Sequence, residues 1–485
     1  MTTNYGRIKL STNLAPTLEN IPVILSRVFP DHIKNKNDSE YLYEYYTGKQ
    51  DILDRVKVIR PEVNNKIVVN HSLSITDFKV GYVFGGEVKL VRRGKDLVGK
   101  SGGDDNIAKL SQYLDGAYKK TSDRELAEWI FATGAGYRAV LPENGEIPFV
   151  LDVYSPLDTF VVYSSEIGQK PIICGHYATN YNADGSEYIT LGVYTEEIYV
   201  EYELASPIVV NNTKTVDIVS VENQKDVKPN PMGMLPIIEY PANPARMGCF
   251  ETVKTMLDAI NLLASDRVNG VEQFVQAYWK FKNCDVEDED IPKIAQLGAI
   301  KIKSQPGVDA DAELVSSELD QSQVQTLVDD AYQTILIICS MPDRMMSAGG
   351  NTCTSMEIGQ GWVAAEDWAR NFEAIFDRSE KRFLSTVLKI LNESAESEVK
   401  DLSLSEIEIK FTRNKLANMM VKAQTGLNLK RLGVHPRIVL ETINLFADPE
   451  NVYIESKEYI DKMWEQGERT PQTQNVGENL PKNAE

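Results

Sequence analysis

The sequence contains few residues able to bind metals or to form disulfides. Its 485 residues include four histidines and five cysteines, and no two cysteines form a C-x-x-C pair. A structural zinc site needs clustered thiolate or imidazole ligands, and a disulfide framework needs cysteines that can pair. We therefore expect no metal site, no disulfide framework and no cofactor, and we expect the thiols to stay reduced.

Long apolar runs are also missing. No stretch of about 18 or more apolar residues occurs, so the sequence predicts no membrane-spanning helix. The N-terminal residues 1–20 lack the apolar core of a signal peptide. We therefore expect a chain that is made and assembled in the cytoplasm and that has no membrane partner.

Two common catalytic motifs are missing as well. No G-x-G-x-x-G follows a predicted strand, and no H-E-x-x-H occurs. The acidic run 285–290 lacks the glycine and the bidentate spacing of a calcium loop, so a solvated turn is the preferred interpretation. The amides of residues 349–352 could cradle a phosphate, but a flexible connector is the favoured interpretation. We expect a protein that is not an enzyme.

The chain has far more acidic than basic residues. It carries 71 Asp and Glu against 51 Lys and Arg, which gives a formal net charge of −20. Proteins that grip DNA usually present a basic face, because much of their affinity comes from neutralising phosphates. The charge argues against tight DNA binding, but it allows a duplex to slide past walls that do not hold its phosphates.

What the chain does have is a large apolar fraction arranged in two kinds of pattern. With 42% hydrophobic residues it can bury a sizeable core, and roughly 150 residues per domain suggest about three domains. We expect a short helix after Asn37-Asp38-Ser39 that ends at Gly48, a helix that closes at Gly85-Gly86, and a helix that follows Ser122. From 137 to about 204, period-two runs separated by turn residues predict an antiparallel meander.

The second half of the chain is mostly helical. Apolar residues spaced three and four apart predict an amphipathic helix over 250–276 and another from Asp320 that stops at Pro342. Between them, 277–318 forms an insert with strand-like pieces at 278–281 and 299–303. We expect the two helices to form a hairpin that presents the insert to partners.

A glycine-containing connector follows the hairpin and leads into further helices. We expect a long helix from Thr354 or Ser355 to about Asn392, a strand over 406–411, and three short helices after Asn414. His435-Pro436 is interpreted as a turn. The polar residues 466–485 are expected to be disordered.

This order of elements, together with local sequences, resembles the portal proteins of long-tailed bacteriophages over about residues 40–465. Each motif is weak alone, and their order and spacing carry the resemblance. The motifs are 64–70 leading to 81–86, 134–137, 150–153 with Ser155-Pro156, 235–240, and 445–450. Two departures concern the short insert and His435-Pro436, where the family more often has a Ser-Thr-type helix start.

The resemblance implies an α+β fold, the phage portal fold, with an α/β wing, a two-helix stem, a small α/β clip, a long wing helix and a helical crown. It assigns the chain in order: wing 1–247 with the meander 137–204, first stem helix 248–276, clip 277–318, second stem helix 319–341, tunnel loop 342–354, long helix and strand completing the wing 355–413, crown 414–465, and disordered tail 466–485.

The resemblance also implies a function. Proteins of this family form a homo-oligomeric ring, usually of twelve subunits, at one vertex of the capsid of the virion, and the same is expected of this chain. Its channel takes in double-stranded DNA without sequence specificity during packaging and releases it at ejection. The implied partners are the terminase large subunit, the head–tail adaptor, and the major capsid and scaffolding proteins.

Two groups of site residues follow from the resemblance. The tunnel loop would approach DNA most closely, through Arg344, Met345, Met346, Ser347, Ala348, Gly349, Gly350 and Asn351. The clip would offer positive charge to partners or to entering DNA, through Lys280, Lys282, Lys293, Lys301 and Lys303.

Acids on the two stem helices would line part of the channel and keep a duplex near its axis. These are Asp258, Asp266, Glu272, Asp329 and Asp330. Two alternatives stay open from the residues themselves: another head–tail structural protein, or an acidic enzyme of unknown class.

Overall fold

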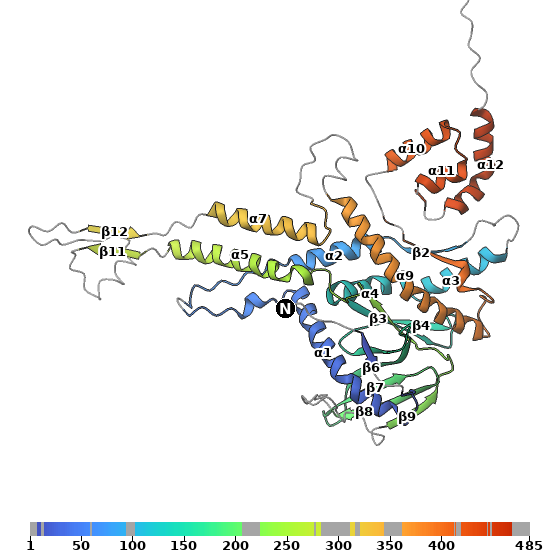
Figure 1. Ribbon diagram of the computed structural model, residues 1–485, viewed down its shortest axis with the longest axis horizontal. Coiled ribbons are helices and arrows are strands. Elements are labelled where there is room, and N and C mark those ends of the chain that lie inside the picture. The colour runs from blue at the N-terminus through green and yellow to red at the C-terminus, as the bar shows by residue number, and fades with distance from the viewer. Residues whose placement is uncertain are drawn as a thin grey trace, which may run out of the picture. The chain divides into compact units, whose positions relative to one another are not determined.

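The computed structural model describes most of the chain (Figure 1). The described residues are 7–10, 14–58, 61–93, 102–205, 224–275, 278–282, 311–315, 321–343, 361–411, 413, 419–443, 445–446 and 449–467. They divide into two compact units. The first combines Met1–Tyr82 with Gln112–Leu404, and the second combines Val83–Ser111 with Ser405–Glu485.

The first unit contains two β-sheets stacked on each other. The larger has the strand order β1-β5-β6-β7-β8-β9, and the smaller has the order β10-β3-β4. Only the β1–β5 pair of these sheets is parallel. The strands are β1 Ile8–Leu10, β3 Ala135–Pro142, β4 Phe149–Tyr154, β5 Thr159–Ser164, β6 Pro171–Tyr181, β7 Glu187–Tyr194, β8 Ile198–Ala205, β9 Gln224–Pro229 and β10 Ile237–Pro241.

The predicted antiparallel meander is therefore confirmed, but it is shared between two sheets. Strand β5 shows why. Its residues Phe160 and Val162 pack on one face with helix α1, while Val161 and Tyr163 pack on the other face against the smaller sheet. A strand covered on both faces is apolar at consecutive positions rather than at alternate ones. The apolar run of β5 thus marks the centre of a layered core.

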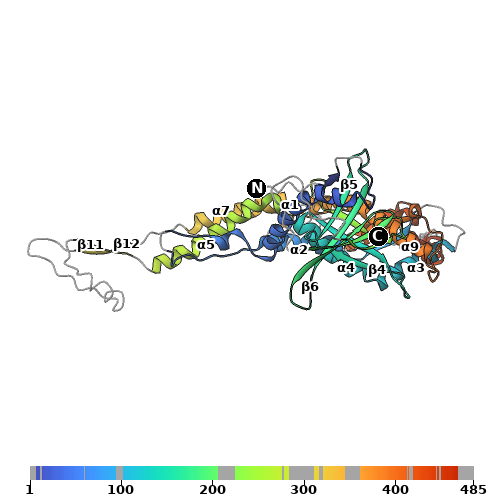
Figure 2. The same ribbon diagram turned by 90° about the horizontal axis from the view of Figure 1, so that it is seen from below.

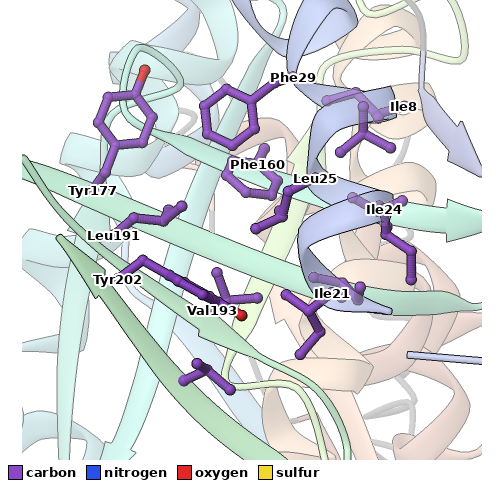
Figure 3. Close-up of a cluster of buried hydrophobic side chains, with 14 of the residues drawn as sticks. Ile8, Ile21, Ile24, Leu25, Phe29, Phe160, Tyr177, Leu191, Val193 and Tyr202 are labelled. Carbon is purple, nitrogen blue, oxygen red and sulfur yellow. The ribbon is translucent and has the colours of Figure 1, made fainter. Parts of the chain in front are cut away.

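Helix α1 (Ile21–Thr47) covers the larger sheet. Its Ile21, Ile24, Leu25 and Phe29 meet the sheet residues shown in Figure 3, and all four are buried. The prediction of a short helix starting after Asn37-Asp38-Ser39 was wrong, because the spacing of three and four between these apolar residues extends the helix back to Pro22 in its first turn. The predicted end at Gly48 is confirmed, with a left-handed φ of 103°.

Helices α4 (Lys119–Thr133) and α9 (Trp362–Glu393) pack against the smaller sheet. The predicted start of α4 after Ser122 was wrong by four residues, because the helix begins at Lys119 and the Tyr118 carbonyl already accepts the amide of Ser122 in the first turn. The predicted start of α9 near Thr354 also fails. Gly361 stands before Trp362 with a left-handed φ of 81°, which interrupts any helix passing through it.

The second unit contains a two-stranded antiparallel ladder and three short helices. Strand β2 (Val88–Arg92) pairs with β13 (Ile407–Phe411), which confirms the predicted strand at 406–411. The helices are α10 (Met419–Arg431), α11 (Pro436–Ile443) and α12 (Pro449–Gly467), as predicted after Asn414. The interpretation of His435-Pro436 as a turn was wrong, because these two residues form the start of a helix. Pro436 opens α11, and the His435 ring nitrogen Nδ1 accepts the Arg437 amide at 3.3 Å.

Helix α2 (His71–Phe84) ends just before Gly85-Gly86 as predicted, and helix α3 (Gly102–Gly116) follows β2. None of the described helices is long and apolar enough to cross a membrane. Several predictions lie outside the described residues. These are the strand-like piece 299–303, the helix start at Asp320, the tunnel-loop residues 344–351 and the tail from 468 onward. Residues 466–467 of the predicted tail instead end helix α12.

Candidate functional site

Two helices of the first unit form the predicted hairpin. Helix α5 (Lys254–Val275), preceded by a 3-10 turn over Glu251–Val253, packs side by side with α7 (Gln321–Ile338) (Figures 1 and 2). Strand β11 (Tyr278–Lys282) pairs antiparallel with β12 (Asp311–Val315), with Tyr278 opposite Val315 and Lys282 opposite Asp311. The chain thus leaves α5 and returns to α7 at one place, as the sequence predicted for the insert.

The hairpin is anchored at one end in a core of its own. Leu257 and Ile260 of α5, together with Ile335 and Cys339, are buried against Tyr45 of α1 and other apolar residues. Beyond this core, the described residues of α7 before Ile335 are exposed or only partly buried. The apolar contacts that hold the hairpin are therefore concentrated at its base.

Farther along α5, beyond the apolar core, an extended segment of the chain holds the helix by hydrogen bonds. The amides of Asn65, Ile67 and Val69 donate to side chains of Asn269, Ser265 and Asn261, at 2.7, 2.9 and 2.8 Å. These three α5 side chains are at most 2% exposed. We call residues 65–69 with their α5 partners the brace.

The brace works because two periodicities match. Alternate amides of an extended chain repeat about every 6.6 Å, and side chains four apart on a helix repeat about every 6.0 Å. Three successive pairs can therefore form without distorting either partner. The segment 64–70, which carries the family resemblance in the sequence, thus has a physical role in holding α5.

Further polar contacts tie the brace to the rest of the unit. Asn261 donates through Nδ2 to Oε1 of Gln50 at 2.5 Å, and Gln50 donates in turn to the Tyr45 carbonyl at 3.1 Å. At the other end of the brace, the side-chain amide of Asn65 donates through Nδ2 to Oε2 of Glu272 at 2.6 Å. A buried amide that finds its partners stabilises one arrangement, whereas one left unpaired costs about 1–3 kcal/mol. The brace therefore fixes the direction of α5.

The acids predicted to line a channel separate into two groups. On α5, Asp258 accepts from Tyr45 and Lys254, Asp266 pairs with Arg55 at 2.9 Å, and Glu272 accepts from Asn65. On α7, Asp329 and Asp330 are exposed, although Gln325 donates to Asp329 at 2.7 Å. The α5 acids thus hold the hairpin to its own subunit, and the α7 acids remain the candidates for a channel wall.

A buried lysine lies where α7 ends. Lys79 of α2 is 1% exposed, donates to the Cys339 carbonyl at 2.8 Å, and places its ammonium 3.4 Å from the centre of the Trp368 ring. Burial lowers the pKa of Lys79 to about 8. This side chain joins α2, the end of α7 and α9 next to the start of the predicted tunnel loop.

Little of the predicted site itself falls within the described residues. Lys282 is exposed on β11, and Lys280 lies two residues before it on the same strand. Lys293, Lys301 and Lys303 lie outside the described residues, as do the predicted DNA-contacting residues of the tunnel loop, Arg344 to Asn351. Among the described residues, no group of three or more His, Cys, Asp or Glu side chains could hold a metal ion.

The brace residues were missed at the level of sequence. Their signal is a row of small polar residues four apart, Asn261, Ser265 and Asn269, within an otherwise amphipathic helix. Such a row looks like an ordinary solvated face until the extended segment that covers it is known.

One stretch of the sequence satisfies the spacing of two catalytic motifs. Residues 94–101 read G-x-x-x-x-G-K-S, and 99–103 read G-x-S-x-G. Both motifs act at the end of a strand in an α/β sheet that feeds a helix. Among the described strands, the preceding β2 pairs with β13 alone, in a two-stranded antiparallel ladder, and residues 94–101 are not described. The spacing therefore lacks the structural context of either chemistry.

Two solved structures resemble this one over most of its length. A chain of the "Virion of native gene transfer agent (GTA) particle" is 11% identical, with a TM-score of 0.41, and the match covers 82% of this chain and 89% of that one. A chain of the "Neck of empty GTA particle computed with C6 symmetry" is 10% identical, with a TM-score of 0.39, and the match covers 75% and 85%. No curated protein matches the sequence.

A family model decides the identity. The model described as "Phage portal protein, SPP1 Gp6-like" matches residues 25–472, which is most of the chain. This match confirms the resemblance drawn from the sequence and replaces the two alternatives, another head–tail protein and an acidic enzyme. The chain belongs to the SPP1 Gp6-like family of phage portal proteins, structural and non-enzymatic components of the virion.

Proposed function

We propose that twelve copies of this chain form a ring whose channel carries double-stranded DNA into the capsid during packaging and out of it at ejection. Membership of the portal family implies an oligomeric ring in the virion. The observation that carries the proposal for this chain is the α5–α7 hairpin, braced along one side and apolar on faces that its own subunit leaves open.

The open apolar faces support packing between neighbouring subunits. Val271 of α5 is 54% exposed, and Leu327 and Ile337 of α7 are 57% and 77% exposed. Large apolar side chains that gather on one helical pair usually mark a surface that another protein covers. A ring needs two different patches on each subunit, and two helices offer two such sides.

The ring contact can be tested by placing a charge on α7. Replacing both Leu327 and Ile337 by aspartate should raise the subunit concentration needed for ring assembly at least tenfold. The reason is that burying a leucine-sized side chain contributes about 1.5–3 kcal/mol and a tenfold change needs only about 1.4 kcal/mol. Ring fraction against concentration, measured by mass photometry and negative-stain microscopy, gives the result.

The control for this test is Ile167→Asp, because Ile167 is fully exposed on the turn between β5 and β6. It should leave assembly unchanged. Rings that form equally well with both kinds of variant would contradict a contact through α7.

We further propose that the hairpin is the stem of the portal and that the insert 277–318 is the clip. The wing would comprise 1–247 and 355–413, and the crown 414–465. The exposed Lys282 supports a clip that presents positive charge. With Lys280, Lys293, Lys301 and Lys303, it would meet the terminase large subunit during packaging and the head–tail adaptor afterwards. The capsid and scaffolding proteins would surround the rest of the ring.

The tunnel loop, 342–354, would be the closest approach to DNA. It follows α7, whose Asp329 and Asp330 are exposed and would repel phosphates. A duplex kept off the wall by like charge stays mobile along the channel axis. Between Arg344 and Asn351 the adjacent Gly349 and Gly350 would let the copies adopt different conformations around a helix that lacks the symmetry of the ring.

Deleting residues 344–351 tests this assignment. Rings should still assemble, because the stem contacts remain, but packaging of DNA into heads should fall at least tenfold or the packaged DNA should be lost. A variant with a Gly/Ser segment of the same length serves as the matched control, and it should package more DNA than the deletion. Normal packaging by the deletion variant would refute the tunnel-loop assignment.

A further inference from the structure

A basic cavity of about 660 Å³ opens in the first unit, away from the hairpin. It lies between the start of β1, the turn that follows β5, strand β10 with the residues after it, and helix α9. Its volume falls within the range of about 300–1,000 Å³ that is usual for small-molecule sites. Its lining, as far as the structure describes the chain, includes five cationic side chains and one carboxylate, although the net charge of the chain is −20.

The floor of the cavity is rigid. Glu239 of β10 accepts from Arg246 through both carboxylate oxygens, at 2.6 and 2.9 Å, and also accepts from the Tyr163 hydroxyl. All three side chains are more than nine-tenths buried. The single carboxylate is thus hydrogen-bonded to its neighbours, and its one negative charge cannot balance all five cations.

Four further cations surround this floor. They are Arg7, Lys9, Arg378 and Arg382, contributed by β1 with the residue before it and by α9. Within the described part of the chain, none of the four forms an ion pair with a carboxylate. Arg7 donates to Gln169 at 3.3 Å and lies 4.6 Å from the centre of the Tyr163 ring. Both contacts orient its guanidinium without cancelling its charge.

This arrangement is electrostatically unfavourable while the cavity holds only solvent. The pKa of Arg7 lies below its ordinary value, chiefly because the guanidinium is partly buried, and repulsion from Arg246 and Arg378 adds to the effect, against the opposing influence of Tyr163 and Glu239. Like charges gathered in one concavity raise the local concentration of counter-ions and are stabilised by an anion that enters. A ligand of opposite charge therefore completes the site.

We propose that this cavity binds a ligand with at least two phosphoryl groups, held by Arg7, Arg378 and Arg382. Guanidinium groups are planar forks that match phosphate oxygens in pairs. A phosphoryl group carries close to two negative charges and three acceptor oxygens, so two of them balance four cations better than isolated carboxylates do. The source is either a free polyphosphate-type anion or nucleic acid, whose phosphodiesters carry one negative charge each and would balance the cations only in larger number.

Titration calorimetry of the assembled ring with inorganic pyrophosphate tests the proposal. Saturable binding is expected, and the double variant Arg378→Ala/Arg382→Ala should weaken it at least tenfold. Arg124→Ala/Arg370→Ala is the matched control, because both arginines are exposed and lie outside the cavity. This control removes the same charge from the chain and should change the affinity less than twofold.

Two further arms separate the sources and the competing ligand class. A short DNA duplex that pyrophosphate displaces identifies nucleic acid as the source, while a duplex that fails to compete identifies a free anion. A hexaglutamate peptide should bind at least tenfold more weakly than pyrophosphate. Absence of saturable pyrophosphate binding, equal loss in both double variants, or tighter binding of the peptide would each overturn the proposal.

Discussion

Replacing Arg138 by methionine should lower the free energy of unfolding by about 3–5 kcal/mol, because it leaves buried charges unpaired. Arg138 of β3 is fully buried and pairs with Asp123 of α4 and with Glu380 of α9. Lys119 bridges the same two carboxylates at 2.7 and 2.9 Å. Two cations and two anions thus form a neutral network that is almost completely buried.

The pKa of Arg138 shows how strongly the surrounding negative charges stabilise its protonated form. Burial alone would lower it, but the negative charges around the guanidinium, Asp123 foremost, raise it above its ordinary value. The Tyr240 hydroxyl donates to Glu380 at 2.8 Å and brings β10 into the same network. Without the guanidinium, one cation faces two buried carboxylates, and the joint between the smaller sheet, α4 and α9 carries an uncompensated negative charge.

The matched control is Arg370→Met on the same helix as Glu380. Arg370 pairs with Glu366 at 3.3 Å, but its side chain is 67% exposed, so the loss should be only about 0–1 kcal/mol. Equilibrium urea unfolding at fixed subunit concentration, followed by tryptophan fluorescence, measures both. Adding Asp123→Asn to Arg138→Met restores neutrality and should recover part of the loss. An Arg138 variant as mild as the control would refute the network as a stabilising element.

The network also shows what the sequence could not predict. Arg138 lies in a strand between Tyr137 and Ala139, which face the larger sheet, and the pattern gives no sign of what the opposite face meets. One partner, Glu380, is 242 residues away along the chain. Local periodicity records which residues share a face, but not which distant element covers it.

The hairpin could be predicted because its signals are local. Amphipathic spacing in α5 and α7, and the change of pattern between them, depend only on neighbours in the chain. The start of α1 was missed because Asn37-Asp38-Ser39 reads as a helix start, whereas the helix passes through these residues and Ser39 is buried. Asn, Asp and Ser favour helix starts, but this preference is weak compared with tertiary packing. They can therefore lie inside a helix when tertiary contacts of the neighbouring turns stabilise the helix as a whole.

The candidate site could be predicted only in part, because its local motifs are visible in the sequence but the pairing between distant segments is not. The segment 64–70 stood out as a family motif, and the polar row of Asn261, Ser265 and Asn269 is visible in the sequence. Their pairing links residues about 200 positions apart, as the separation of 192 between Val69 and Asn261 illustrates. Only the folded structure shows that alternate amides of the extended segment have nearly the same spacing as side chains four apart on the helix.

Acidification should destabilise this protein before the carboxylates of its buried ion pairs, Asp123 and Glu239, take up protons, because His32 is buried as a neutral ring. His32 of α1 is 1% exposed and packs against Phe29, Phe160 and Tyr177, three residues visible in Figure 3. The Tyr177 hydroxyl gives its only proton to the Leu157 carbonyl at 2.8 Å. The contact of 3.1 Å between this hydroxyl and the ring nitrogen Nε2 therefore requires Nε2 to donate.

A second proton on His32 would have no favourable place. Burial lowers the pKa of His32 to about 3, and the positive charge of Lys36 adds to the effect. Lys36 itself contacts Tyr177 and Asp158, both at 3.3 Å, so the Asp158 carboxylate is already paired with Lys36. In the unfolded chain the ring titrates near its ordinary pKa of about 6.5.

The sign of the effect follows from these two values. Between pH 6.5 and 3 the unfolded chain binds a proton that the folded chain refuses, so stability is complete above the unfolded pKa and falls as the pH falls. The loss approaches about 1.4 kcal/mol per pH unit below the unfolded pKa and reaches about 2.7 kcal/mol at pH 4.5, relative to the stability at pH 7.5. That window lies above the range in which Asp123 and Glu239, whose pKa values are lowered by their cationic partners, begin to take up protons.

His32→Gln isolates this contribution, because glutamine keeps a donor for Tyr177 and does not titrate. The variant should be less stable at pH 7.5, since it loses aromatic packing, yet its stability should fall with acid by about 1.4 kcal/mol per pH unit less than that of the parent chain between pH 6.5 and 4.5. His435→Gln, at an exposed position in the other unit, should leave the slope unchanged. Urea unfolding at several pH values measures the slopes. If the His32 variant kept the parental slope, the acid sensitivity would have to arise elsewhere, and the neutral ring between α1 and the larger sheet would not be its cause.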